Sequence, residues 1–158
     1  MFRARPSVLV VPAIALLAIH GAGCDGGSDR ISAAELVQRG DEICGKERES
    51  FARIQSNPPA NASVAAAQTA ELIKVTRDAN SQLRDLKPPE ELQAAYDRYL
   101  ETRERAVDQM ERGRDAAEDR NSAVYGAAQA AVARDAPQRR KLAQAVGLKV
   151  CSSSTATA

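Results

Sequence analysis

Histidine is almost absent from this chain, and that scarcity excludes several kinds of chemistry. The sole histidine is His20, which lies in an N-terminal segment that we predict is removed. The remaining chain then lacks the usual base of a Ser-His-Asp triad and the usual protein ligand of zinc, di-iron and haem sites. It also has no Gly-rich phosphate-binding loop. We therefore predict no catalytic residue, no metal site and no cofactor, and we expect the protein not to be an enzyme.

Aromatic residues are also scarce. They make up 3% of the 158 residues, and tryptophan is absent. A sheet core favours β-branched and aromatic residues, whereas the abundant Ala, with Leu, Glu, Gln and Arg, favours helices. The composition therefore predicts an all-α protein. Without residues 1–23 the chain is long enough for one domain and not for two.

Neither sign of charge is in excess. The chain has 22 Lys and Arg against 21 Asp and Glu, so loss of Arg3 and Arg5 leaves a formal charge of −1. Domains that bind nucleic acid or an anionic membrane surface are usually basic. Nucleic acid is therefore not a predicted partner.

The N-terminal apolar run, residues 8–19, is too short to span a membrane. It has about a dozen residues, whereas a spanning helix needs about 20. Arg3 and Arg5 precede it and small residues follow it, which is the order of a removable export signal. We predict a signal peptide over residues 1–23; a retained transmembrane helix is the alternative.

Cys24 follows directly after this signal. The sequence Gly21-Ala22-Gly23-Cys24 resembles a bacterial lipobox, in which the cysteine is diacylated and becomes the mature N-terminus, although Gly21 stands where an aliphatic residue is usual. Two acyl chains give a stable membrane anchor. We therefore predict lipid attachment at Cys24 and a location on the extracytoplasmic side of the cell membrane. The alternative is an ordinary cleaved signal with Cys24 merely nearby.

Two further cysteines, Cys44 and Cys151, remain once Cys24 is assigned to lipid. An oxidising compartment favours a disulfide between them. Two free thiols or a metal-binding pair are the alternatives.

Four helices are predicted, and together they make an up-down-up-down bundle. They run from Ser32 to the residues 57–59 break, from Asn61 or Ser63 to the residues 87–89 break, from Pro89 to a turn at residues 119–122, and from Ser122 to Val146. The apolar face predicted on the second helix comprises Val64, Gln68, Leu72, Val75, Ala79, Leu83 and Leu86. On the fourth helix it comprises Val124, Ala128, Ala131, Asp135, Leu142 and Val146. Residues 24–30 are expected to form the lipidated cysteine and a flexible tether, residues 31–151 the bundle domain, and residues 152–158 a disordered tail.

The fourth helix contains Pro137, where we expect a kink or two abutting helices. Gly147 is predicted to end this helix. Cys44 lies about 18 Å into the first helix, so the bridge requires the chain after Gly147 to fold back along that helix. We expect Leu148 and Val150 to pack in the groove.

Three side chains of the third helix are candidates for ligand binding. Tyr96, Tyr99 and Arg103 share one face of it. The alternative for the tyrosines is core packing with partly exposed hydroxyl groups. Arg103 either extends to solvent or pairs with Glu47 or Asp135.

Clustered carboxylates offer a weaker cation site. Asp115, Glu118 and Asp119 share a helical face and could bind calcium, but they lie among arginines, and a solvated surface is the simpler interpretation. Asp41, Glu42 and Glu49 are likewise interpreted as surface charge.

Several segments of the chain resemble a group of small actinobacterial lipoproteins of unknown function, which are predicted helical bundles. The similar segments are Ile31-Ser32, residues 41–44, the two double-proline breaks, residues 96–100, and Gly147-Leu148 before Cys151. The resemblance implies an envelope location and a Cys44–Cys151 pair, and it brings no catalytic residue.

These features predict a non-enzymatic binding or scaffolding module of the cell envelope. Its expected partners are the membrane, through the lipid on Cys24, and an envelope protein or small ligand. The alternative is an accessory protein that binds a small ligand or cation in a pocket between helices. An enzyme with paired carboxylates is a third hypothesis.

Overall fold

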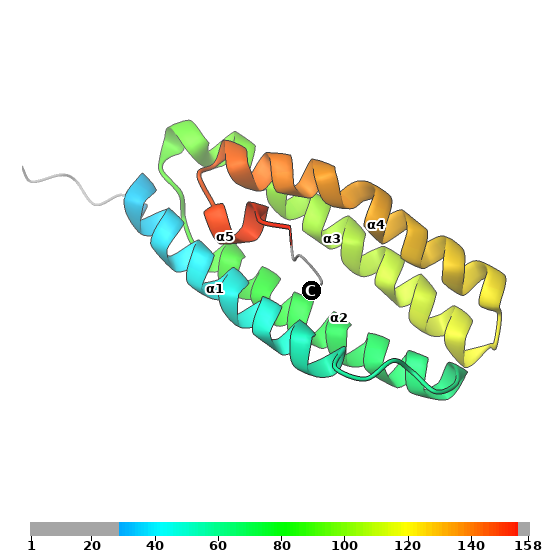
Figure 1. Ribbon diagram of the computed structural model, residues 1–158. Helices are drawn as coiled ribbons and strands as arrows, with labels where there is room; N and C mark the ends of the chain where they lie inside the picture. The colour runs from blue at the N-terminus through cyan, green and yellow to red at the C-terminus, as the bar shows by residue number, and fades with distance from the viewer. Residues whose placement is uncertain (1–28, 155–158) are drawn as a thin grey trace, which may run out of the picture.

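The computed structural model describes residues 29–154, and this part of the chain is all helical (Figure 1). It has no strand, which agrees with the predicted fold class. The helices are α1 (Ala33–Ile54), α2 (Ala62–Asp85), α3 (Glu90–Glu118), α4 (Ser122–Ala145) and the short α5 (Lys149–Ser152). The first four correspond to the four predicted helices, whereas α5 was not predicted.

Three of the long helices begin at a polar side chain that caps the first turn. Ser32, Asn61 and Asn121 each accept a hydrogen bond from the backbone N–H three residues later, at 3.0–3.2 Å. Such caps satisfy one of the free N–H groups at a helix start. Of the two caps considered for α2, Asn61 is the one used. Helix α3 starts after Pro89 without a side-chain cap.

Helices α3 and α4 end in the same way. Each is followed by a residue in the left-handed conformation, Arg120 with φ 55° and Gly147 with φ 85°. The N–H of that residue donates to the carbonyl three residues back, and the next N–H donates to the carbonyl five residues back. This is the Schellman motif, and glycine is its usual left-handed residue. The predicted stop at Gly147 is confirmed.

The long helices contact one another in chain order, α1 with α2, α2 with α3, and α3 with α4. Helix α5 contacts both α1 and α4 and lies between them at one end of the molecule (Figure 1). The predicted return of the chain along α1 is therefore confirmed. Leu148 is fully buried, as expected, whereas Val150 is only half-buried.

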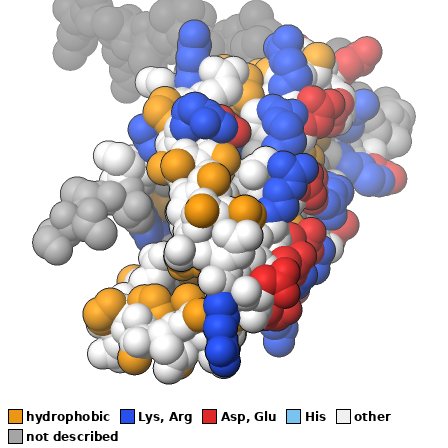
Figure 2. Space-filling view, turned by 90° about the vertical axis from the view of Figure 1, so that its right-hand side faces the viewer, with side chains coloured by type: hydrophobic (Ala, Val, Ile, Leu, Met, Phe, Trp, Pro, Cys, Tyr) orange, Lys and Arg blue, Asp and Glu red, His pale blue; other side chains and the backbone are white. Residues whose placement is uncertain are grey.

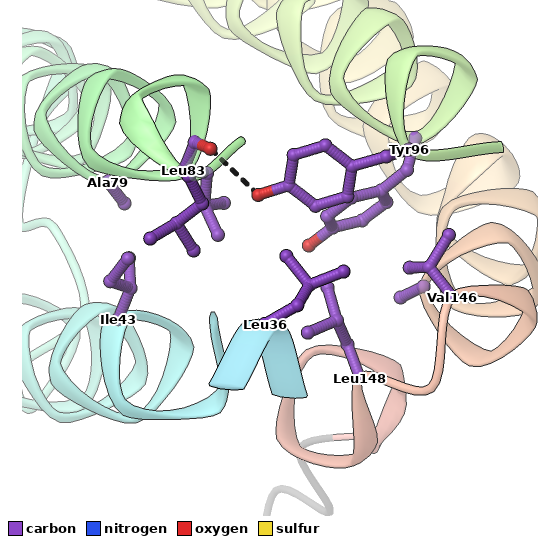
Figure 3. Packing of buried hydrophobic residues seen from close by; sticks show 10 residues of the cluster. Leu36, Ile43, Ala79, Leu83, Tyr96, Val146 and Leu148 are labelled. Atoms are coloured by element: carbon purple, nitrogen blue, oxygen red, sulfur yellow. Dashed lines mark hydrogen bonds between the residues drawn. The ribbon is translucent and has the colours of Figure 1, made fainter. Parts of the chain in front are cut away.

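One apolar cluster joins all four long helices and the residues before α5. Leu36 and Ile43 come from α1, Leu83 from α2 and Tyr96 from α3, and Val146 and Leu148 lie in the connection between α4 and α5 (Figure 3). The hydroxyl group of Tyr96 donates to the carbonyl of Leu83 at 2.8 Å. Burying large apolar side chains of this kind contributes about 1.5–3 kcal/mol each.

The predicted face of α2 is correct near its C-terminal end, where Ala79, Leu83 and Leu86 are buried, and differs from the buried face in the first part of the helix. Val64 is 38% exposed, and the buried residues are Ala65, Ala66, Thr69, Ile73, Thr76, Ala79, Asn80 and Leu83. Small residues carry much of this contact, with Ala65 and Ala66 packing near Ala117. In the first part of α2, a prediction weighted toward large apolar residues therefore points about one position away from the buried face. On α4, Val124 and Asp135 were also expected to face inward and are exposed.

The side of the molecule near the α3–α4 turn carries both signs of charge. Figure 2 shows Lys and Arg side chains beside Asp and Glu side chains along this face. Arg77 of α2 pairs with Glu111 of α3, and Arg84 pairs with Glu104 on the same two helices. None of the described helices combines the length and the apolar character needed to cross a membrane.

Candidate functional site

Cys44 of α1 and Cys151 of α5 form a disulfide, with their Cα atoms 5.3 Å apart. The sharp reversal at Gly147 brings α5 back along α1, and Leu148 then lies against Gly40. A Cβ atom at Gly40 would stand 2.5 Å from Leu148 Cδ2. The absence of a side chain at Gly40 is thus what allows this close approach.

Asp41 fixes the start of α5. Its two carboxylate oxygens accept hydrogen bonds from the backbone N–H groups of Lys149, at 3.1 Å, and Val150, at 2.8 Å. A carboxylate is favoured at a helix start because the free N–H groups there carry partial positive charge. Asp41 was interpreted as surface charge, and that interpretation is wrong. Its partners lie more than a hundred positions along the chain, so no local pattern indicates the contact.

Arg103 lies at the centre of a buried polar network. Its Nη2 donates to both carboxylate oxygens of Glu47, at 2.7 and 2.8 Å, its Nε donates to Asn80 Oδ1, and its Nη1 donates to the hydroxyl of Tyr99 at 3.1 Å. The arginine is 9% exposed. Of the alternatives considered for Arg103, pairing with Glu47 is the one observed. Asp135, the other proposed partner, is exposed beside Arg134.

The two predicted tyrosines have different positions. Tyr96 belongs to the core, with its hydroxyl bound to a backbone carbonyl. Tyr99 connects Arg103 to the disulfide, because its hydroxyl lies 3.8 Å from Cys44 Sγ. A bridged sulfur carries no proton, so the tyrosine hydroxyl is the donor. Both hydroxyls are buried, in contrast to the partly exposed hydroxyls expected for core packing.

Burial changes the proton affinity of several groups in this region. It raises the pKa of Tyr96 and of Tyr99, because a buried phenolate loses its hydration. Burial alone would lower the pKa of Arg103, but Tyr99 and Glu47 offset this and the pKa is raised. The pKa of Arg139, on α4, is lowered by burial and by the neighbouring positive charge of Arg103.

A pocket of about 620 Å³ lies between α1 and α4, and we refer to it as the α1–α4 pocket. Its size is within the 300–1,000 Å³ usual for small-molecule sites. Helices α1, α3 and α4, with α5 and the residues after it, all contribute to its wall. The lining residues are Cys44, Glu47, Arg48, Phe51, Ala52, Gln55, Tyr99, Arg103, Ala136, Arg139, Arg140, Val150, Cys151, Ser153 and Ser154.

The pocket brings together two of the three predicted ligand-binding residues. Tyr99 and Arg103 line it, and Tyr96 does not. Arg139 and Arg140 were not predicted, because two consecutive arginines on a helix usually lie on a solvated surface. Pro137, two residues before Arg139, is the one local sequence feature that sets this part of the helix apart. Pro137 is inside α4 and has no N–H to donate to Ala133, and Arg139 Nη2 donates to the adjacent carbonyl of Val132 at 3.1 Å.

The ends of the predicted domain are longer than expected. Arg30 donates to the carbonyl of Pro88 at 2.8 Å, although it was assigned to a flexible tether. Ser152 belongs to α5, and Ser153 accepts a hydrogen bond from Arg48, although both were assigned to a disordered tail. Cys24, the predicted signal peptide and residues 155–158 lie outside the described residues.

The predicted carboxylate cluster does not form a recognisable cation site. Asp115 accepts hydrogen bonds from Arg114, as the surface interpretation implies. Within residues 29–154, no three His, Cys, Asp or Glu side chains are grouped as a metal ion would require.

The chain matches no protein-family model, no curated protein and no solved structure. The sequence itself and the α1–α4 pocket are therefore the observations that bear on its function.

Proposed function

We propose that this protein is a lipid-anchored binding module on the extracytoplasmic side of a cell membrane. The proposal of an anchor is supported by the order of charged, apolar and small residues before Cys24. A disulfide between Cys44 and Cys151 also fits an oxidising compartment. The proposed lipid on Cys24 makes the membrane one partner of this protein.

The observation that favours a small ligand over surface scaffolding is the α1–α4 pocket. Tyr99, Arg103 and Glu47 converge on its wall from two helices, and the disulfide forms another part of it. Small-molecule sites typically combine an apolar surface with a few fixed polar groups. The proposed module therefore binds its ligand between helices rather than only on its outer surface.

We propose further that binding is not followed by catalysis. The sole histidine lies in the predicted signal. Cys44 and Cys151 are joined, which leaves neither as a nucleophile. The carboxylate of Glu47 is held by Arg103 and is therefore poorly placed to act as a base.

For the fold, we propose an up-down-up-down bundle of the four long helices with a kink in α4. Support comes from the short connections between helices that contact each other in chain order. Pro137 supports the kink, since a proline inside a helix removes one backbone hydrogen bond and crowds the preceding turn.

Two experiments test the proposed function. Metabolic labelling with a fatty-acid analogue should label the wild-type chain and not Cys24→Ala, and equal labelling of the two would refute the anchor. Native mass spectrometry of the protein purified from its host should show a co-purifying small molecule. A chain with no bound molecule and a stable complex with another protein would favour the scaffolding alternative.

A further inference from the structure

The wall of the α1–α4 pocket has more positive than negative side chains. Arg48, Arg139 and Arg140 line it, and within residues 29–154 none of them forms an ion pair. The one carboxylate in the lining, Glu47, is already engaged by Arg103. Arg139 and Arg140 are half-buried, whereas Arg48 is exposed and donates to Ser153. Charges that are partly removed from water are normally paired, so the two half-buried arginines indicate a negatively charged ligand and disfavour a cation.

Arg139, in the wall of this pocket, has a buried donor without a partner. Among the described residues, its Nη1 is the buried side-chain polar atom that makes no hydrogen bond. Its Nη2 is held by the carbonyl of Val132, which fixes the guanidinium group in the pocket wall. An unsatisfied buried donor is costly. The pKa of Arg139 is lowered, first by burial and then by Arg103, and a bound anion would offset both effects.

The rest of the wall suits an apolar group. Phe51 and Ala52 of α1, Ala136 of α4 and the Cys44–Cys151 bridge all line the pocket. An aromatic ring such as Phe51 also offers a flat surface on which an arginine or a ligand ring can stack. A ligand with one anionic end and an apolar body would contact both parts.

We infer that the α1–α4 pocket binds a small organic anion, a carboxylate or a phosphate with an apolar body, and that Arg139 and Arg140 hold its charged end. This inference rests on the proposed function and adds the chemical class of the ligand. Arginine suits the role because its planar group can donate two hydrogen bonds to one carboxylate or phosphate.

The test compares matched ligands that share a phenyl ring and differ in charge. Thermal unfolding and calorimetric titration of the full chain, purified in non-ionic detergent, are measured with phenylacetate, phenyl phosphate, phenylethanol and phenylethylamine at constant ionic strength. We expect the two anions to bind and the alcohol and the amine not to bind. Dihexanoyl phosphatidic acid is the lipid arm, and its binding in preference to phenyl phosphate would identify the anion as a lipid headgroup.

Variants on one helix separate a local site from a general effect of charge. Arg139→Gln and Arg140→Gln should each weaken anion binding by about tenfold to a hundredfold, the value of a charge-assisted hydrogen bond. Arg134→Gln removes the same charge from an exposed position on α4 outside the pocket and should leave the Kd unchanged. An equal loss in Arg134→Gln, or an unchanged Kd in the Arg139→Gln/Arg140→Gln double variant, would overturn the inference.

Failure of this inference can be told apart from failure of the proposed function. Binding of phenylethanol as tight as that of phenylacetate, or a neutral molecule in the native mass spectrum, would overturn the anion class and leave a ligand-binding pocket. A native spectrum without any small molecule, together with no binding of any of the matched ligands, would overturn both.

Discussion

Gly40→Ala tests whether the close approach of Leu148 to α1 holds the C-terminal segment in place. An alanine Cβ at position 40 would stand 2.5 Å from Leu148 Cδ2, too close for real atoms. Leu148 is fully buried, and its N–H is bound to the carbonyl of Ala143. It is also only three residues from bridged Cys151. The leucine side chain therefore has little freedom to move away.

Gly45 of the same helix provides the matched control. A Cβ there would meet nothing within 4 Å, so Gly45→Ala should stabilise the protein by about 0.5–1 kcal/mol through helix propensity alone. Gly40→Ala has the same gain, but overpacking a filled core costs about 1–3 kcal/mol. The unfolding free energies of the two variants should therefore differ by about 1–3 kcal/mol, with Gly40→Ala the less stable.

Urea unfolding of the oxidised full chain, followed by far-ultraviolet circular dichroism, measures this difference. In reduced protein the difference should shrink, because α5 can then leave α1 and release the contact. Equal stabilisation by both substitutions would refute the reasoning and show that Leu148 is free to repack.

Three further predictions concern the buried network, the reversal and the tyrosines. Glu47→Ala should lower the unfolding free energy by about 3 kcal/mol, because it leaves Arg103 buried without its counter-charge, whereas exposed Glu49→Ala should change it by less than about 0.5 kcal/mol in the same urea titration; similar losses would contradict a buried pair. Gly147→Ala should cost about 1–2 kcal/mol, since alanine is strained at φ 85°, and an unchanged thermal midpoint would exclude that strain. Burial raises the pKa of Tyr96, so the unfolded chain releases this proton first and stability should fall above about pH 10, by up to about 1.4 kcal/mol per pH unit. Tyr96→Phe should flatten this fall, and an identical slope would assign it to other groups.

Local chemistry explains why the helix boundaries could be predicted. The cap at Ser32 and the stop at Gly147 depend on residues within one turn of the helix end, so a short stretch of sequence contains the whole cause. The all-α class follows from composition for a similar reason, since propensities add along the chain.

Contacts between distant segments could not be predicted in the same way. Asp41 has the surroundings of a surface carboxylate, and only the reversal after α4 brings the start of α5 to it. Glu47 was one of two partners considered for Arg103, but Asn80 was not considered, because its polar neighbours Asp78 and Ser81 give no sign that it is buried. Arg139 lines the pocket because of the way α4 is placed relative to α1. The sequence pattern of one helix does not determine that placement.

The Cys44–Cys151 bridge also determines which parts of the molecule bear mechanical load. It closes a loop with a sequence separation of 107 residues. Force applied between the N-terminal and C-terminal ends of the chain passes from α1 through the two sulfur atoms to α5. The residues between the two cysteines then carry no force. The fully stretched chain is shorter by about 350 Å than it would be without the bridge, at about 3.3–3.6 Å per residue. Glu47, Tyr99, Arg103 and Arg139 all lie inside this loop, so a pull on the two ends of the chain would leave these parts of the pocket wall unloaded.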